Sequence, residues 1–145
     1  MSWVRVWIHL VFTTYKGTPF FNSPEIRKIV FNHIVENAKL KNIWLDSIGG
    51  HKQHVHCLLS LGKDQTISDT VQLIKGESSF WINKNNLVNG KFGWQDDYWA
   101  VSVSENQIQY VQEYIKNQEE HHRTKTFEEE IEEFMKKYRW SIQKD

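Results

Sequence analysis

The stretch IWLDSIG (43–49) is followed closely by HVHCLLSL (54–61), and a Gly49-Gly50 pair marks the break between them. Both stretches are short, mostly apolar and bounded by turn residues, which predicts two strands joined as a hairpin. On either side of this hairpin, over residues 24–41 and 66–84, apolar residues recur at helical spacing. The first of these helices is expected to begin at a serine cap followed by proline. The sequence therefore predicts a hairpin that lies between two helices.

Further strands and helices are expected outside this unit. Residues 3–14 alternate between two faces and carry β-branched and aromatic side chains, which predicts a strand, and a short strand is expected at about 97–103. Helices are expected at about 105–120 and at 127–138. The predicted order βαββαβ, followed by helices, is the α+β, ferredoxin-like and RRM-like antiparallel sheet. We expect the first two helices to cover one face of the sheet and the other face to be left for substrate or for the C-terminal helices.

The composition describes one globular domain and excludes several classes of protein. A chain of 145 residues with 39% hydrophobic side chains predicts a single domain over 1–145, with a C-terminal helical extension at about 105–140. The 18 basic and 18 acidic side chains cancel, which disfavours coating of nucleic acid by bulk positive charge. Cys57 is the only cysteine, so a disulfide within the chain is excluded. No stretch approaches the roughly 20 apolar residues of a membrane span, and we expect a cytoplasmic protein without a membrane partner.

The first signal for chemistry is the sequence His54-Val55-His56 on a predicted strand. Side chains two residues apart in a strand point to the same face, so both imidazoles are expected to project together. Two neutral imidazoles at this separation can hold one divalent metal ion. The alternative is a pair of surface histidines beside a turn.

The second signal lies in the helix predicted at about 105–120, where Tyr110, Tyr114 and Gln118 recur every four residues along one face. An amide oxygen one turn from a phenol can hold a metal ion that polarises a phosphate for attack by that phenol. The alternative is a half-buried tyrosine that packs on the sheet and a solvated glutamine. Tyr110 is the weaker candidate nucleophile, because the residue four positions after it is a tyrosine and not a ligand.

The two signals together fit one reaction. The phenol of Tyr114 would attack a phosphodiester, while a metal ion held by His54, His56 and Gln118 neutralises charge on the non-bridging oxygens. The products would be a covalent phosphotyrosine and a free hydroxyl. Because the new bond retains the energy of the phosphodiester, the hydroxyl of a second strand could reverse the step and rejoin DNA without ATP. The absence of a glycine-rich phosphate loop is consistent with such chemistry.

These motifs resemble those of the single-tyrosine insertion-sequence transposases of the HUH endonuclease superfamily, which include the REP-associated tyrosine transposases. His54-Val55-His56 resembles the HUH element, and EYIKNQ (113–118) resembles the nucleophile run Tyr-Ile/Val-x-Asn-Gln. IKGESS (74–79) resembles the second helix of the family, and WQxxYxA (94–100) resembles the stretch before its catalytic helix. The resemblance covers about residues 4–140.

The resemblance implies a metal-dependent DNA endonuclease and strand transferase that works with Mg²⁺ or Mn²⁺ and forms a 5′-phosphotyrosine. It implies single-stranded DNA with hairpin ends as substrate. It also implies a homodimer with composite active sites, in which the HUH strand of one subunit works with the tyrosine helix of the other. Exposed tryptophans are candidate DNA contacts, and so are five basic or polar residues that could equally be ordinary surface residues: Arg5, Lys75, Ser78, Lys84 and Lys91.

Some roles and functions stay open. His121 or His122 could be an extra ligand or a proton shuttle, or could instead interact favourably with a helix dipole. The acidic run at 127–133 is expected to be a packing or dimer-supporting helix, because it would repel phosphate. The competing functions are a non-catalytic or domesticated single-stranded nucleic-acid-binding module on the same fold, and a small metallohydrolase with water as its nucleophile.

Overall fold

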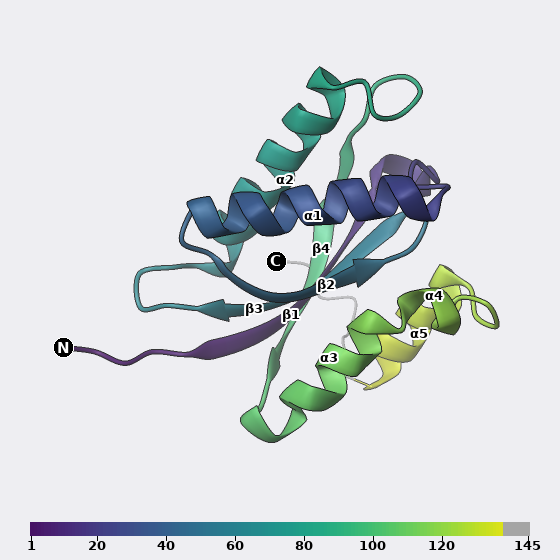
Figure 1. Cartoon of the computed structure of the whole chain (residues 1–145). Coiled ribbons are helices and arrows are strands. Elements are labelled where there is room, and N and C mark those ends of the chain that lie inside the picture. The colour runs from purple at the N-terminus through teal and green to yellow at the C-terminus, as the bar shows by residue number, and fades with distance from the viewer. Residues whose placement is uncertain (138–145) are drawn as a thin grey trace.

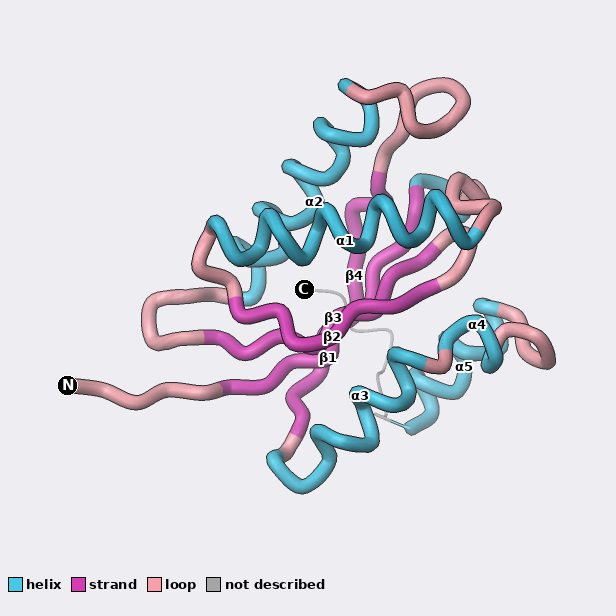
Figure 2. Tube along the Cα trace, viewed as in Figure 1, coloured by secondary structure: helices cyan, strands magenta, loops and turns pink. Residues whose placement is uncertain are grey.

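The computed structural model describes residues 1–137 and contains a four-stranded antiparallel sheet with helices on both faces (Figures 1 and 2). The strand order is β2-β3-β1-β4, so β3 and β1 are central. The strands are β1 (Val6–Thr14), β2 (Trp44–Gly50), β3 (His54–Leu61) and β4 (Trp94–Val103). The helices are α1 (Pro24–Leu40), α2 (Ile67–Lys84), α3 (Ile108–Lys116), α4 (Gln118–His121) and α5 (Phe127–Lys137). The 3₁₀ turns η1 (Tyr15–Gly17) and η2 (Glu105–Gln107) precede α1 and α3. The predicted α+β, ferredoxin-like arrangement is confirmed.

The two faces of the sheet carry different helices. Helices α1 and α2 lie on one face, and α3, α4 and α5 lie together on the other (Figure 1). Of the two expected uses of the second face, by substrate or by the C-terminal helices, the structure shows the helices. The described residues include no helix of the length and apolar character that crossing a bilayer requires.

The long helices begin where their capping residues predict. The Ser23 hydroxyl accepts a hydrogen bond from the Ile26 amide, and Pro24 occupies the first turn of α1. The Thr66 hydroxyl accepts from the Asp69 amide in the same way at the start of α2. Each cap satisfies an amide that the helix itself leaves without a partner.

The main core lies between the sheet and the pair α1 and α2. Alternate residues of the central strands point into it, because successive side chains of a strand face opposite ways. Helices α1 and α2 meet them with residues spaced three or four positions apart. The buried members from these elements are Leu10, Phe12, Val55, Cys57, Leu59, Val30, Ile34, Ala38, Val71, Ile74 and Ile82.

A second, smaller core fixes α3 to the opposite face. It consists of Trp7 and Leu58 from the sheet and Val111 and Ile115 from α3. Helix α3 packs closely on β2 at Gly49, where a Cβ would overlap the carbonyl oxygen of Ile115. Only glycine allows this approach, so Gly49 sets the distance between the helix and the sheet.

Several element boundaries differ from those that the sequence predicts. The first strand begins at Val6 and not at residue 3, and β4 begins at Trp94 and not at about residue 97. The helix predicted at about 105–120 is broken into η2, α3 and α4, because Asn117 has φ −96° and ψ 21° between the last two. The predicted end of the last helix, Tyr138, lies outside the described residues, and a single domain over 1–145 stays a prediction.

Candidate active site

The histidine pair lies at the start of the central strand β3, on the face that carries α3 to α5 (Figure 1). His54 and His56 alternate with Val55 and Cys57 along β3, and the latter two point into the main core. Both imidazoles are fully buried and their ring centroids are 5.2 Å apart. The shared face expected from the strand spacing is thus observed, and the alternative of a surface pair does not hold.

Helices α3 and α4 bring Tyr114 and Gln118 to this pair. His54 Nε2 lies 3.0 Å from Gln118 Oε1, and the Tyr114 ring is 5.6 Å from the His56 ring between centroids. Gln118 is 1% exposed, so it is not the solvated glutamine of the alternative interpretation. The break at Asn117 does not separate the two side chains, because the short α4 starts at Gln118 and keeps its amide over the sheet.

A carboxylate that the sequence interpretation placed elsewhere lies at the centre of the cluster. Glu130 comes from the acidic helix α5 and is completely buried. Its Oε1 lies 3.2 Å from His56 Nε2 and 3.5 Å from His54 Nε2. Its Oε2 accepts hydrogen bonds from the Tyr114 hydroxyl and from Gln118 Nε2, the latter at 3.2 Å. Helix α5 does pack on the sheet as expected, but one of its acidic residues points inward.

Three further histidines surround the cluster. His9 Nε2 on β1 lies 2.9 Å from His56 Nδ1, and His121 Nε2 lies 3.3 Å from Glu130 Oε2. His122 Nε2 is 3.1 Å from Gln118 Oε1 and 3.4 Å from Glu130 Oε1. His122 therefore faces the cluster and is placed to be an additional ligand.

The donor set fits a cation. His122 Nδ1 donates a hydrogen bond to the Lys125 carbonyl, so in a neutral His122 the lone pair is on Nε2. That lone pair faces the amide oxygen of Gln118 and the carboxylate of Glu130, and facing lone pairs need a proton or a metal ion between them. The ligand atoms of His54, His122 and Glu130 all lie within 4.8 Å of one another. These three residues form a possible metal-binding cluster.

The ionisation states of the cluster agree with this arrangement. Burial, followed by the nearby His56, holds the pKa of His54 well below its ordinary value, and the same causes lower the pKa of His9 to about 3. Both imidazoles are therefore neutral at pH 7. Burial alone would raise the pKa of Glu130, but the close contacts with the imidazoles of His122 and His56 outweigh it and leave that pKa below the usual range. Burial and the hydrogen bond to Glu130 raise the pKa of Tyr114, so the phenol holds its proton.

The predicted DNA contacts are scattered and not all accessible. The Arg5 guanidinium lies over the Trp7 and Trp44 rings, at 5.6 and 5.8 Å from their centroids, and Lys75 Nζ donates to the carbonyls of Gln95 and Asp96. Lys84 and Lys91 are exposed. The prediction that Ser78 contacts DNA is wrong. Its side chain is 1% exposed and hydrogen-bonded to the Ile74 carbonyl and the Trp94 indole, which leaves it no surface for DNA.

The sequence does carry a signal for Glu130. It lies three residues after Phe127 and four before Phe134, which is the spacing of residues on one helix face. Phe134 is buried and Phe127 stacks on the His54 ring, so this face is the one that packs on the sheet. An acidic residue within a buried stripe indicates a partner of opposite charge or a metal ion. For His9, the signal is its place between Trp7 and Val11 on the buried face of β1.

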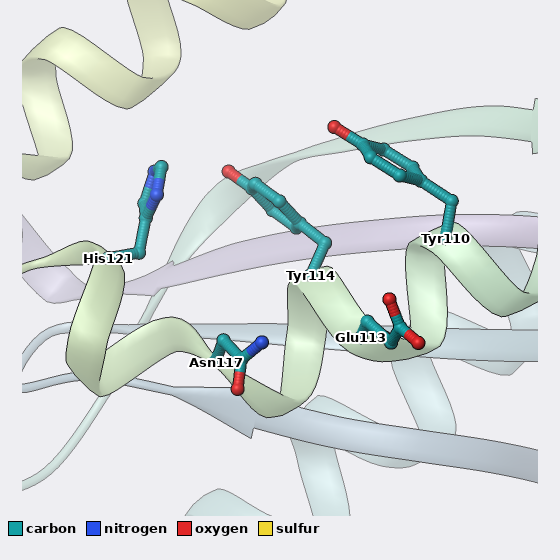
Figure 3. Close-up of a pocket in the computed structure, with 5 residues that line it drawn as sticks. All are labelled: Tyr110, Glu113, Tyr114, Asn117 and His121. Atoms are coloured by element: carbon teal, nitrogen blue, oxygen red, sulfur yellow. The ribbon is translucent and has the colours of Figure 1, made fainter.

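A hollow opens beside the tyrosine along α3 (Figure 3). Its lining residues are Tyr110, Glu113, Tyr114, Asn117 and His121. Tyr110 and Tyr114 project from the same side of α3, and the His121 ring stands beyond Tyr114 (Figure 3). The candidate nucleophile is therefore reached from solvent on this side and borders the buried cluster on the other.

The comparison with known families shows the class of protein to which this βαββαβ sheet belongs, with its cluster of imidazoles, a carboxamide and a phenol. The family model described as "Transposase IS200 like" matches residues 2–118. The chain belongs to this family of IS200-like transposases. The predicted resemblance to single-tyrosine transposases is confirmed at this level.

Two solved structures share the fold. One is a crystal structure of a chain assigned as a transposase from Deinococcus radiodurans R1, with 22% identity and a TM-score of 0.62 over 81% of this chain and 93% of that chain. The other is a REP-associated tyrosine transposase bound to a REP hairpin, with 13% identity and a TM-score of 0.60 over 84% of this chain and 72% of that chain. None of the curated proteins matches the chain.

Proposed function

We propose that the protein is a metal-dependent transposase that cleaves and rejoins single-stranded DNA through a covalent 5′-phosphotyrosine on Tyr114. The observation that carries this proposal is the position of the Tyr114 hydroxyl. It donates to Glu130, which also contacts the imidazoles of His54 and His56. A nucleophile and a set of candidate metal ligands thus meet at one carboxylate, where a bound ion would neutralise charge on the phosphate under attack.

The cleavage step that follows from this geometry transfers the phosphoryl group of one phosphodiester from a 3′ oxygen to the Tyr114 phenol. The Tyr114 oxygen attacks phosphorus, the bond from phosphorus to the 3′ oxygen breaks, and the phosphate becomes attached to the phenol. The phenol proton passes to Glu130, which already accepts its hydrogen bond. The departing 3′ oxygen takes up a proton and leaves as a hydroxyl. Attack by another 3′ hydroxyl reverses the step and joins the strands.

The residues present fit a divalent ion, for which we propose Mg²⁺ or Mn²⁺. We assign His54, His56 and Gln118 as its ligands, with Glu130 and His122 within reach of the same position. Carboxylate and amide oxygens suit these hard cations. The chemistry that a bound ion supplies is neutralisation of charge on the non-bridging phosphate oxygens.

We propose single-stranded DNA with hairpin ends as the substrate, because a structure of similar fold holds a REP hairpin. Arg5, Lys75, Lys84 and Lys91 stay candidate contacts for its backbone. Electrostatic contact with phosphates is sufficient to hold single strands when aromatic rings stack on the bases. A cytoplasmic location is part of the same proposal.

The active site can be built within one chain or shared between two subunits. The described chain brings Tyr114 to its own His56, which supports cleavage within one chain. The resemblance implies instead a homodimer whose composite sites combine the strand of one subunit with the tyrosine helix of the other. A mixture of two inactive variants, one without the tyrosine and one without a histidine ligand, separates the two arrangements.

Incubation with single-stranded DNA from the flanks of the gene, with and without Mn²⁺, tests the proposed function. We expect a protein–DNA conjugate on a denaturing gel that needs the metal ion. Metal-independent binding of DNA with no conjugate would favour the non-catalytic binding module. Turnover without a conjugate would favour a metallohydrolase that uses water.

A further inference from the structure

The hollow beside Tyr114 has a shape and lining of its own. It measures about 230 Å³ and lies between Tyr110 and His121, with Glu113 and Asn117 at its edge (Figure 3). Tyr114 forms part of its wall. Under the proposed function, the group next to the reacting phosphate must lie against this wall, because the other side of the ring borders the buried cluster.

Tyr110 offers a stacking surface in this hollow. It lies one helical turn before Tyr114, projects from the same side of α3, and is 56% exposed (Figure 3). Lys137 Nζ lies 5.4 Å from the centroid of its ring, which places a positive charge close to the same surface. An exposed aromatic ring next to a cation is the arrangement that binds bases and the phosphates between them.

The edge of the hollow favours a base over a phosphate. The Glu113 carboxylate repels phosphate and can only accept hydrogen bonds, whereas the Asn117 amide can donate and accept. Carboxylates accept from the amino group of cytosine, and carboxamides pair with the amino group and ring nitrogen of adenine. Guanine also carries an amino group, whereas thymine offers such a carboxylate only the single N–H of its imide. The polar edge therefore matches a base that carries an amino group.

We propose that this hollow binds the nucleobase next to the scissile phosphate, with Tyr110 stacked on its face and with Glu113 and Asn117 reading an amino group on adenine, cytosine or guanine. The inference rests on the proposed function, since it takes Tyr114 as the nucleophile. It makes Tyr110 a substrate-positioning residue and not a second nucleophile. It also gives the protein a base preference of its own beside the hairpin.

The test measures affinity for oligodeoxyadenylate, oligodeoxycytidylate and oligothymidylate of equal length, by fluorescence anisotropy at fixed salt. We expect Tyr110→Ala to weaken binding of the first two by about five- to a hundredfold, the range for losing one stacked base. Tyr110→Phe keeps the ring and should bind within about twofold of the unaltered protein. Tyr15→Ala, a similarly exposed tyrosine outside the hollow, is the matched control and should bind unchanged.

The base preference gives a second readout. The unaltered protein should bind the adenine and cytosine oligonucleotides more tightly than the thymine one, and Glu113→Ala should remove that difference. Equal binding of all three by the unaltered protein, or unchanged binding by Tyr110→Ala, overturns the inference.

The conjugate assay separates this inference from the proposed function. If Tyr114 forms a conjugate but Tyr110→Ala leaves oligonucleotide binding unchanged, only the proposed base pocket is wrong. Loss of the conjugate in Tyr110→Phe, with its persistence in Tyr114→Phe, would make Tyr110 the nucleophile and overturn both. Base-selective binding with no conjugate in any DNA would sink the proposed function while leaving a base-binding hollow.

Discussion

The hydroxyl of Tyr114 on α3 donates a hydrogen bond to the carboxylate of Glu130 on α5. The same carboxylate contacts His54, His56 and His122, so one acidic side chain links the candidate nucleophile to the candidate metal ligands. Within residues 1–137, four imidazoles lie within 3.5 Å of the Glu130 carboxylate oxygens. A divalent cation bound at this position would stabilise such a buried carboxylate.

Replacement of Glu130 therefore tests the metal site. Glu130→Gln keeps the shape of the side chain but removes its charge, and we expect Mn²⁺ affinity to fall by about tenfold or more. Titration of Mn²⁺ followed by electron paramagnetic resonance measures it. Glu132→Gln removes an exposed charge from the same helix and is the control. Equal loss in both variants would mean that only the overall charge of α5 matters.

Gly49 tests how α3 is placed over the histidines. A methyl group there overlaps the Ile115 carbonyl, so Gly49→Ala should lower the free energy of unfolding by about 1–3 kcal/mol and should also weaken Mn²⁺ binding. Urea denaturation measures the first effect. Gly76→Ala, in α2 with open space around it, should be neutral or should stabilise by up to about 1 kcal/mol. An unchanged Gly49→Ala variant would show that α3 does not need this close approach.

The buried histidines predict a dependence of stability on pH. Because the pKa of His9 is lowered from 6.5 to about 3 in the folded state, the unfolded chain binds more protons below pH 6.5. The free energy of unfolding should therefore fall as the pH drops from 6.5 towards about 3, by up to about 1.4 kcal/mol per pH unit for each such group. Denaturation in EDTA at several pH values measures this slope, and His9→Gln should make it shallower. A slope equal to that of the unaltered protein would contradict the burial of a neutral His9.

A mixture of two inactive variants decides between sites within one chain and sites shared by two chains. Tyr114→Phe lacks the nucleophile and His56→Ala lacks a ligand. If each site is built within one chain, as in the described structure, we expect their mixture to form no conjugate with DNA. Composite sites would instead pair the intact histidines of one subunit with the intact tyrosine of the other. Recovery of conjugate on mixing would therefore establish the homodimer that the resemblance implies.

Much of the fold follows from local sequence patterns. Period-two alternation gives the strands, and caps such as Ser23 and Thr66 give the helix starts. The same local rules place His54 with His56 on one face. They fail at Asn117, where a φ of −96° and a ψ of 21° separate α3 from α4 although the residues on either side favour a helix.

The sequence predicts only part of the candidate site, because tertiary packing places the other residues. Tyr114 and Gln118 share one helical face by spacing, and the structure brings both to the histidines. Glu130 and His9 come from distant elements, and only the packing of α5 and β1 against β3 places them in the cluster. An acidic run is ordinarily a solvated face, so the inward position of Glu130 is a tertiary property.

The central claim is that the Tyr114 oxygen becomes bonded to DNA. Mass spectrometry of the protein after reaction with single-stranded flanking DNA and Mn²⁺, followed by nuclease and protease digestion, locates the bond. We predict a nucleotide attached through its 5′ phosphate to the peptide that contains Tyr114, and its absence from Tyr114→Phe. A nucleotide on any other residue, or an undiminished conjugate in Tyr114→Phe, would contradict the account.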